Sequence, residues 1–258
     1  MTEFDIIIPA RYASSRLPGK PLRDVAGKTL IERVFDCARK THAARVFIAT
    51  DDETIARVAR DFGADVLLTS AEHESGTDRL AEVVDQLGLD DDRLVVNLQG
   101  DEPLVPEQLI HQVVDGLAGD GDASIATVCK EVRNQRDYSD PSVVKVVRNR
   151  KGYAMYFSRA PIPWARNADG VSSRWPQKPA NVFHHIGIYA YRAGYLRRFA
   201  TQEPCELESI EKLEQLRALW NGERIRVLKA YSLPGPGVDT IHDLEHVIRI
   251  FERQPLDD

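Results

Sequence analysis

Apolar runs and amphipathic stretches alternate along the first half of the chain. Short apolar runs typical of buried strands lie at 4–10, 46–50, 65–69, 94–98 and 123–128. Between them, four stretches repeat apolar residues with the spacing of a helix that buries one face, at 29–40, 51–62, 77–87 and 106–117. Apolar strands separated by such helices predict a mostly parallel sheet covered on both faces, with right-handed crossovers.

The second half has a different pattern. Residues 143–159 predict two strands around a turn, and 184–192 predict another strand. Helical spacing returns at 207–222 and 240–253; the first of these predicts an apolar face of Leu207, Ile210, Leu213, Leu216, Leu219 and Trp220. We therefore predict a single α/β domain over residues 1–258, with a smaller β-rich lobe inserted at about 130–195.

Composition excludes several classes of function. The formal net charge of −6 argues against nucleic-acid binding, because such domains are usually basic. The three cysteines, Cys37, Cys129 and Cys205, form no C-x-x-C pair, so neither a disulfide framework nor a thiolate zinc site is predicted. No apolar stretch approaches the ~20 residues that span a membrane, and no signal-peptide pattern is present. The expected location is the cytoplasm, with no membrane or nucleic-acid partner.

The loop after the first strand, IPARYASSRLPGKPL (8–22), concentrates the cations Arg11, Arg16 and Lys20. It lacks the GxxxxGK[ST] phosphate-loop pattern, because Pro21 follows Lys20, and it also lacks the GxGxxG dinucleotide fingerprint. Guanidinium forks and a mobile ammonium suit a triphosphate, and ligands of parallel sheets bind beyond the carboxyl ends of the strands. A solvated turn is the alternative, but the spacing favours phosphate binding.

Two acidic positions leave metal binding and helix capping open. In VVNLQGDEPL (95–104), an apolar strand delivers Gln99 and Asp101 to the same edge of the sheet. In PGPGVDTIHDLE (234–245), Asp239 precedes a helix. Magnesium takes one or two protein carboxylates and completes its shell with phosphate oxygens and water, whereas Asp before a helix often only caps it.

Local sequence says less about an acceptor pocket. Strand alternation puts His185, Gly187 and Tyr189 on one face, where they would either line a polyol pocket or serve the core. Arg159 is suited to a substrate carboxylate or to a neighbouring acid. By spacing alone, Glu214 and Gln215 belong to the solvated side of the 207–222 helix.

Taken together, these motifs resemble the cytidylyltransferases that activate eight- or nine-carbon acidic sugars, and most closely the branch that acts on 3-deoxy-manno-octulosonate (Kdo). The matching stretches follow the family's order over nearly the whole chain: IPARYASSRLPGKPL, SGTDRLAE, VVNLQGDEP, GYAMYFSRAPIPW, HHIGIYAYR, ESIEKLEQLR and PGPGVDT. The resemblance implies a Rossmann-like nucleotidyltransferase fold and transfer of CMP from CTP to Kdo, for lipopolysaccharide biosynthesis. It also implies magnesium as cofactor and a homodimer in which the inserted lobe supplies the contact.

The resemblance further implies roles for single residues. On the CTP side it implies phosphate contacts and catalytic charge from Arg11, Arg16 and Lys20, a cytosine contact from Pro9 and Ala10, and further nucleotide contacts from Ser75, Gly76, Arg79 and Gln99. Asp101 and Asp239 would hold magnesium. On the sugar side it implies Arg159, His185, Tyr189, Glu214 and Gln215, with Arg166 as a further candidate.

Other functions remain as alternatives. Within the class, the acceptor would be sialic acid or an amino-substituted Kdo. A metal-dependent glycosyltransferase would need Asp-x-Asp at a strand end, but the two such pairs, at 90–92 and 120–122, precede predicted strands. A non-catalytic nucleotide sensor is disfavoured by the full set of cationic and acidic positions.

Overall fold

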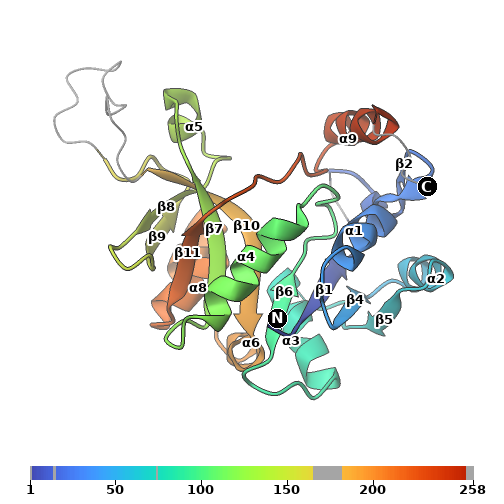
Figure 1. Ribbon diagram of the computed structural model, residues 1–258, viewed down its shortest axis with the longest axis horizontal. Helices are drawn as coiled ribbons and strands as arrows, with labels where there is room; N and C mark the ends of the chain where they lie inside the picture. Colours follow the sequence, from blue (N-terminus) through green and yellow to red (C-terminus); the bar gives the residue numbers. More distant parts are fainter. Residues whose placement is uncertain (1, 14–15, 74, 165–181, 254–258) are drawn as a thin grey trace.

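A mixed β-sheet runs through the molecule (Figure 1). The structure is a computed structural model and describes residues 2–13, 16–73, 75–164 and 182–253. Within these residues one sheet holds nine strands: β1 (Phe4–Ala10), β4 (Arg45–Thr50), β5 (Asp65–Leu68), β6 (Leu94–Asn97), β7 (Ile125–Glu131), β8 (Lys145–Arg148), β9 (Ala154–Ser158), β10 (Phe183–Arg192) and β11 (Ile225–Lys229). A small separate hairpin joins β2 (Asp24–Val25) to β3 (Lys28–Thr29).

The strand order confirms a mostly parallel sheet. It runs β11-β7-β10-β6-β1-β4-β5, and β1 pairs in parallel with both β4 and β6. The exceptions are β10, which is antiparallel to β6, β7 and β8, and the antiparallel β8–β9 hairpin of the predicted lobe. Strand β8 pairs with the first residues of β10, so the lobe and the main sheet share one continuous hydrogen-bonded surface.

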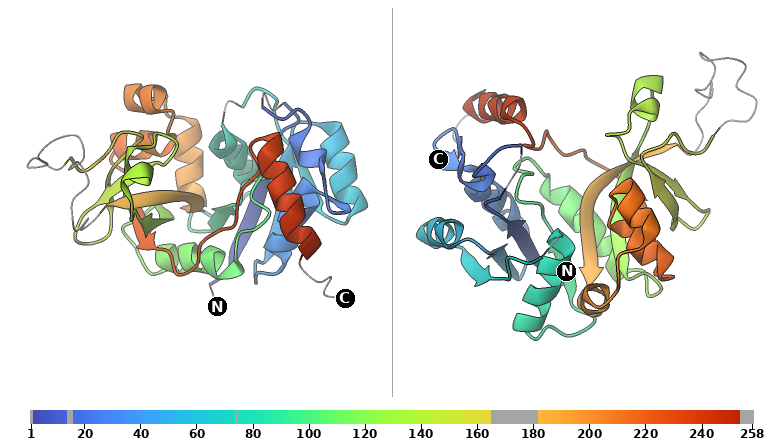
Figure 2. Two further views of the ribbon diagram at one scale, coloured as in Figure 1. Left: turned by 90° about the horizontal axis from the view of Figure 1, so that it is seen from above. Right: turned by 180° about the vertical axis from the view of Figure 1, so that it is seen from behind.

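Helices cover both faces of the sheet (Figures 1 and 2). One apolar cluster packs against α1 (Leu30–Arg39), α2 (Glu53–Asp61) and α4 (Glu107–Ala118). The opposite cluster packs against α3 (Gly76–Gln86), α6 (Ala193–Ala200) and α8 (Gln215–Trp220). The remaining helices are η1 (Lys20–Leu22), α5 (Gln135–Ser139), α7 (Glu206–Glu211) and α9 (Ile241–Arg253). In the described part of the chain, no helix combines the length and apolar composition needed to cross a bilayer.

Side chains on β10 alternate as the sequence predicts. Ile186 and Ile188 join the cluster beneath α4, whereas Tyr189 and Tyr191 face the α6 and α8 side. The pairing with β7 shifts register between Ile186 and Tyr189, which marks a β-bulge.

The prediction of one continuous helix over 207–222 is wrong. The chain forms α7 and α8 instead, and Lys212 between them has a left-handed backbone with φ 53°. The predicted apolar face is also wrong in part, because Ile210 is 77% exposed and Trp220 is 60% exposed. The end of β9 holds the last turn of α7: Ser158 Oγ donates to Glu211 Oε1 at 2.6 Å, and Arg159 Nε donates to the Glu211 carbonyl at 2.7 Å. These contacts favour the break over helix propagation.

Candidate functional site

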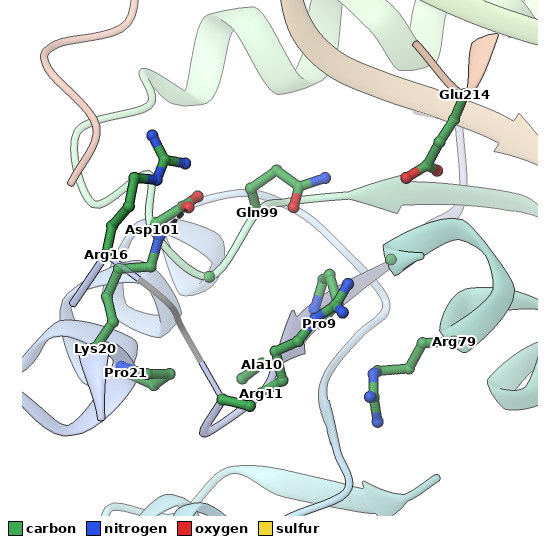
Figure 3. Close-up of a pocket in the computed structure, with 13 residues that line it drawn as sticks. Pro9, Ala10, Arg11, Arg16, Lys20, Pro21, Arg79, Gln99, Asp101 and Glu214 are labelled. Carbon is green, nitrogen blue, oxygen red and sulfur yellow. Dashed lines mark hydrogen bonds and ion pairs between the residues drawn. The ribbon is translucent and has the colours of Figure 1, made fainter. Parts of the chain in front are cut away.

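A cavity of about 360 Å³ opens at the carboxyl ends of β1 and β6 (Figure 3). It is lined by all the residues predicted on the CTP side except Ser75, namely Pro9, Ala10, Arg11, Arg16, Lys20, Gly76, Arg79, Gln99 and Asp101. Ser75 is buried and directly precedes the lining residue Gly76. Its hydroxyl caps α3 by accepting a hydrogen bond from the Asp78 N–H at 3.1 Å. Three loops that are distant in the sequence therefore meet at the predicted edge of the sheet.

Backbone geometry presents Lys20 to this cavity. Gly19 has φ 66°, a conformation that costs glycine little, and its N–H donates to the Tyr12 carbonyl at 3.4 Å. Lys20 then starts η1, with Pro21 in its first turn, where a missing N–H has no consequence. The Lys20 N–H donates to the Leu17 carbonyl at 3.1 Å, so the loop closes on itself before the lysine.

The two predicted metal carboxylates share one cation. Lys20 Nζ lies 2.6 Å from Asp101 Oδ2 and 3.4 Å from Asp239 Oδ1, and Arg16 Nη2 lies 3.0 Å from the same Asp239 oxygen. Figure 3 shows Arg16, Lys20 and Asp101 together at one end of the cavity. Arg16 and Asp239, which lie 223 positions apart in the sequence, are thus brought into contact.

Neither carboxylate caps a helix. The residue before α4 is Pro106, without a side-chain cap, and Asp101 lies further upstream. At α9 the capping contacts come from Thr240 and Asp243, with the Thr240 N–H donating to Asp243 Oδ2 at 2.9 Å. Of the alternatives left by the sequence, capping is therefore excluded for both Asp101 and Asp239.

The segment 234–239 positions Asp239 through its backbone. Figure 1 shows the chain after β11 crossing the molecule toward α9. On the way, the Gly235 N–H donates to the Leu104 carbonyl at 3.0 Å and the Val238 N–H donates to the Asp101 carbonyl at 2.9 Å. A Cβ on Gly237 would lie 2.8 Å from Glu102 Oε1, so glycine permits this close approach. These backbone contacts hold Asp101 and Asp239 close together before any ligand binds.

Arg79 forms the far side of the cavity. It comes from the first turn of α3 and is only 2% exposed. Its guanidinium donates to the Thr69 hydroxyl and lies 3.4 Å from Asp51. Burial lowers the pKa of Arg79, and the nearby charge of Arg11 acts in the same direction. Two cations facing one cavity are suited to an anionic or carbonyl-rich ligand.

A second cavity of about 190 Å³ lies beside the first, between the sheet and the helices α6 and α8. Tyr189, Glu214 and Gln215, three of the residues predicted on the sugar side, line it. Its wall also contains stacked aromatic rings: the Tyr189 and Tyr191 centroids are 5.6 Å apart, and those of Tyr191 and Tyr195 are 6.0 Å apart. Aromatic faces with a few polar groups are typical of small-molecule pockets.

Gln99 and Glu214 line both cavities, so they mark the junction between them. Glu214 follows the break at Lys212, which turns its carboxylate away from the solvated side predicted by helical spacing. Thr77 Oγ1 donates to Glu214 Oε2 at 2.7 Å, and burial raises the pKa of Glu214. The junction thus holds a buried carboxyl group with a raised pKa, which suits it to accept a proton from a substrate hydroxyl.

Two other residues predicted on the sugar side, His185 and Arg159, do not line either cavity. His185 is buried, its Nε2 is 2.9 Å from Thr127 Oγ1, and its ring packs against Phe157 and Tyr189. The Arg159 guanidinium donates to the carbonyls of Glu211 and Pro141. Arg166 lies outside the described residues. Sugar contacts from these three residues remain predictions.

Sequence reasoning missed several residues of the second cavity. Asn97, Tyr191, Tyr195 and Lys212 all line it. The period-two repeat of Tyr189 and Tyr191 was a signal for a shared face. Asn97 was readable as the one polar residue in the apolar run 94–98, two positions before Gln99. Nothing in the local pattern indicated Lys212.

Comparison with known proteins agrees with this site. The sequence profile of the cytidylyltransferase family matches residues 6–225. The chain belongs to the cytidylyltransferase family. One relative of this cytidylyltransferase is the 3-deoxy-manno-octulosonate cytidylyltransferase of Hahella chejuensis, which is 53% identical over 96% of this chain and 97% of its own. The resemblance inferred from the motifs is therefore confirmed, as is the assignment to the nucleotidyltransferases.

Solved structures support the fold of the cytidylyltransferase. A CMP:2-keto-3-deoxy-manno-octonic acid synthetase in complex with CTP superimposes with a TM-score of 0.87 at 39% identity, covering 98% of this chain and 99% of its own. A 4-diphosphocytidyl-2C-methyl-D-erythritol synthase from Anaerococcus prevotii superimposes with a TM-score of 0.61 at 12% identity, covering 98% of this chain and 100% of its own. The second likeness extends to the fold alone.

Proposed function

We propose that this cytidylyltransferase transfers CMP from CTP to the anomeric hydroxyl of Kdo and releases pyrophosphate. The observation that carries the proposal is the junction of the two cavities at Gln99 and Glu214. A triphosphate held by Arg11, Arg16 and Lys20 would meet there a sugar held among the tyrosines. The names of the 53% identical relative and of the 39% identical structure support CTP and Kdo as the pair of substrates.

The reaction is an in-line displacement at the α-phosphorus of CTP. The anomeric oxygen forms the new bond to phosphorus while the bond to the pyrophosphate oxygen breaks, and the pyrophosphate leaves with that electron pair. Such a reaction requires positioning and charge neutralisation more than a covalent nucleophile. Lys20 and the two arginines neutralise the charge on the phosphates, and Glu214 at the junction accepts the proton of the attacking hydroxyl.

We include magnesium in the proposal because the donor set fits it. Asp101 and Asp239 both contact Lys20 Nζ, so their oxygens lie close together beside the phosphate cavity. Two carboxylates plus phosphate oxygens and water are a usual magnesium shell. When bound there, magnesium would polarise the phosphate and lower the pKa of the attacking hydroxyl.

The proposal also includes a homodimer and a cytoplasmic location. In the described sheet β9 pairs only with β8, and Met155 on this edge strand is 62% exposed. Such an edge needs cover, and a second copy of the lobe would supply it. The homodimer predicts a sedimenting species of twice the 29.0 kDa chain mass. We place the enzyme in the cytoplasm, where it would activate Kdo for lipopolysaccharide biosynthesis; the free thiols of Cys37, Cys129 and Cys205 are compatible with such a reducing compartment.

The direct test is an acceptor panel. The enzyme is incubated with CTP, magnesium and one of Kdo, 8-amino-Kdo or sialic acid, and pyrophosphate release is measured. We expect release with Kdo that depends on the metal. Release with sialic acid but none with Kdo would overturn the acceptor, and CTP binding without release for any sugar would indicate a nucleotide sensor.

A further inference from the structure

The second cavity contains a buried polar atom without a partner. Asn97, the last residue of β6, is 2% exposed and lines this cavity. Its Oδ1 atom is buried and has no hydrogen-bond partner within the described part of the chain. Asn97 sits in the middle of the sheet, in register with Ile7 on one side and Tyr189 on the other. A buried acceptor left unpaired is costly, so its persistence indicates a ligand that pairs with it.

The polar neighbours of Asn97 in this cavity leave its carbonyl oxygen for a ligand. Thr77 Oγ1 donates to Glu214 Oε2 at 2.7 Å. The Thr77 and Asn97 side chains also act on the Tyr191 hydroxyl, where they oppose the rise in pKa that burial causes. Neither contact occupies Asn97 Oδ1, which is the atom without a partner in the described part of the chain. The carbonyl end of Asn97 is therefore the end left for a ligand.

The surroundings of Asn97 indicate the chemistry of that ligand. The stacked rings of Tyr189, Tyr191 and Tyr195 offer apolar faces to C–H groups, while isolated polar atoms recognise hydroxyls. A carbonyl oxygen can only accept, so the ligand must present a proton donor. Gln99 and Glu214 connect the cavity to that of the nucleotide, so the ligand is a polyhydroxylated acceptor rather than a regulator bound elsewhere.

We propose that Asn97 Oδ1 accepts a hydrogen bond from one hydroxyl of the acceptor sugar and thereby determines acceptor specificity. This inference rests on the proposed function and names a residue that recognises its second substrate. A sugar that lacks the hydroxyl leaves Oδ1 unpaired. The expected discrimination against it is roughly tenfold to a hundredfold in kcat/KM, the usual effect of one unmade buried hydrogen bond. An amine at the same position also donates a proton and is accepted.

The experiment crosses protein variants with sugar variants. Kdo and analogues that each lack one non-anomeric hydroxyl are assayed for pyrophosphate release with the wild type, Asn97→Leu and Tyr191→Phe. The wild type should disfavour one analogue by tenfold or more. In Asn97→Leu the ratio of kcat/KM for Kdo to kcat/KM for that analogue should fall to about one. The KM for CTP should stay within about twofold of the wild-type value. Tyr191→Phe removes a hydroxyl from the same wall of the cavity but leaves Asn97 Oδ1 in place, so it should retain the preference.

Two results would overturn the role of Asn97: an undiminished preference in Asn97→Leu, or an equal loss of kcat/KM for Kdo and every analogue. If circular dichroism shows Asn97→Leu unfolded, Asn97→Ala carries the same comparison. The proposed function is tested separately by the wild type alone. Release with sialic acid only would overturn Kdo as acceptor. The same comparison of wild type and variants with deoxy analogues of sialic acid would then test the role of Asn97. No release with any sugar would overturn both proposals.

Discussion

Lys20 is the residue at which the nucleotide loop and the acidic pair meet. Its side chain is 15% exposed and contacts both Asp101 and Asp239. Two carboxylates this close would repel one another without a cation between them. The sequence presented Lys20, Asp101 and Asp239 as three separate candidates, each with an ordinary structural explanation. Only their contact in space makes them one site.

At this scale, Asp239→Asn should abolish most turnover without unfolding the protein. Asp239 is 52% exposed, and exposed ion pairs contribute only about 0–1 kcal/mol to the free energy of unfolding. Loss of one of the two carboxylates that would hold magnesium beside the transferring phosphate should lower kcat roughly a hundredfold or more. Pyrophosphate release and the melting temperature are the two measurements. Asp92→Asn, at a 96% exposed position, is the control, and full activity of Asp239→Asn would refute the metal assignment.

The buried His185 makes a prediction about acid stability. Burial lowers its pKa to about 3, and the neighbouring His184 acts in the same direction. In the unfolded chain the pKa returns to about 6.5, so the unfolded state binds the proton first as the pH falls. The free energy of unfolding should therefore decrease from about pH 6.5 downward, with His185 contributing up to ~1.4 kcal/mol per pH unit.

Urea unfolding of the wild type and of His185→Gln between pH 7 and 5 measures this effect. The variant starts less stable because it loses the contact with Thr127, but its stability should fall less steeply with pH. The slope, rather than the starting value, is the readout. His246→Gln, an exposed change on α9, should keep the wild-type slope. Equal slopes in all three proteins would contradict the prediction.

Among the elements, the break between α7 and α8 is where sequence and structure differ most. The strands β1, β4, β5, β6 and β7 and the helices between them were predictable because each buries a continuous or periodic apolar face. The 207–222 pattern satisfies the same rule, yet contacts of Glu211 with Ser158 and Arg159 stop the helix. These partners lie 53 and 52 residues away, beyond the reach of any local pattern. The missed cavity residues follow from this break and from the pairing of β6 with β10, which places Asn97 beside Tyr189.

The same break predicts a stabilising substitution. Lys212 has φ 53°, a left-handed conformation that costs a residue with a Cβ about 1–2 kcal/mol. Glycine removes this cost but loses more entropy on folding, so Lys212→Gly should raise the free energy of unfolding by about 0.5–1 kcal/mol. Urea unfolding measures it. Lys151→Gly, at an exposed turn residue without positive φ, should be neutral or destabilising. A less stable Lys212→Gly would mean that the lysine side chain makes a favourable contact.

At the scale of the whole molecule, the two ends of the parallel strands have different roles: one end carries the cavities, and the other holds the strands in register. The carboxyl ends of β1 and β6 carry the cavities, and the crossing segment 234–239 adds Asp239 from the end of the chain. The opposite ends must hold the strands in register without help from these loops. Asp5 does this: its carboxylate is fully buried and forms paired hydrogen bonds with Arg45 of β4 and with Arg93 before β6.

Asp5→Asn should therefore destabilise the fold without touching the site. Burial alone raises the pKa of Asp5, but hydrogen bonds and charge from Arg93 and Arg45 outweigh it and hold the pKa below its usual value of 3.8. An amide cannot neutralise the two guanidinium groups, so the free energy of unfolding should fall by about 3 kcal/mol at pH 7.

The sign of the pH dependence separates this effect from simple packing loss. A lowered folded pKa contributes stability above the unfolded value and loses it as the pH falls through the folded value. The gap between wild type and Asp5→Asn should thus stay constant from pH 7 to 5 and narrow only below about pH 4. Glu3→Gln, where the carboxylate is 72% exposed beside the same Arg93, should cost less than about 1 kcal/mol. A gap within about 0.5 kcal/mol at pH 7 would mean that the apolar core alone sets the strand register.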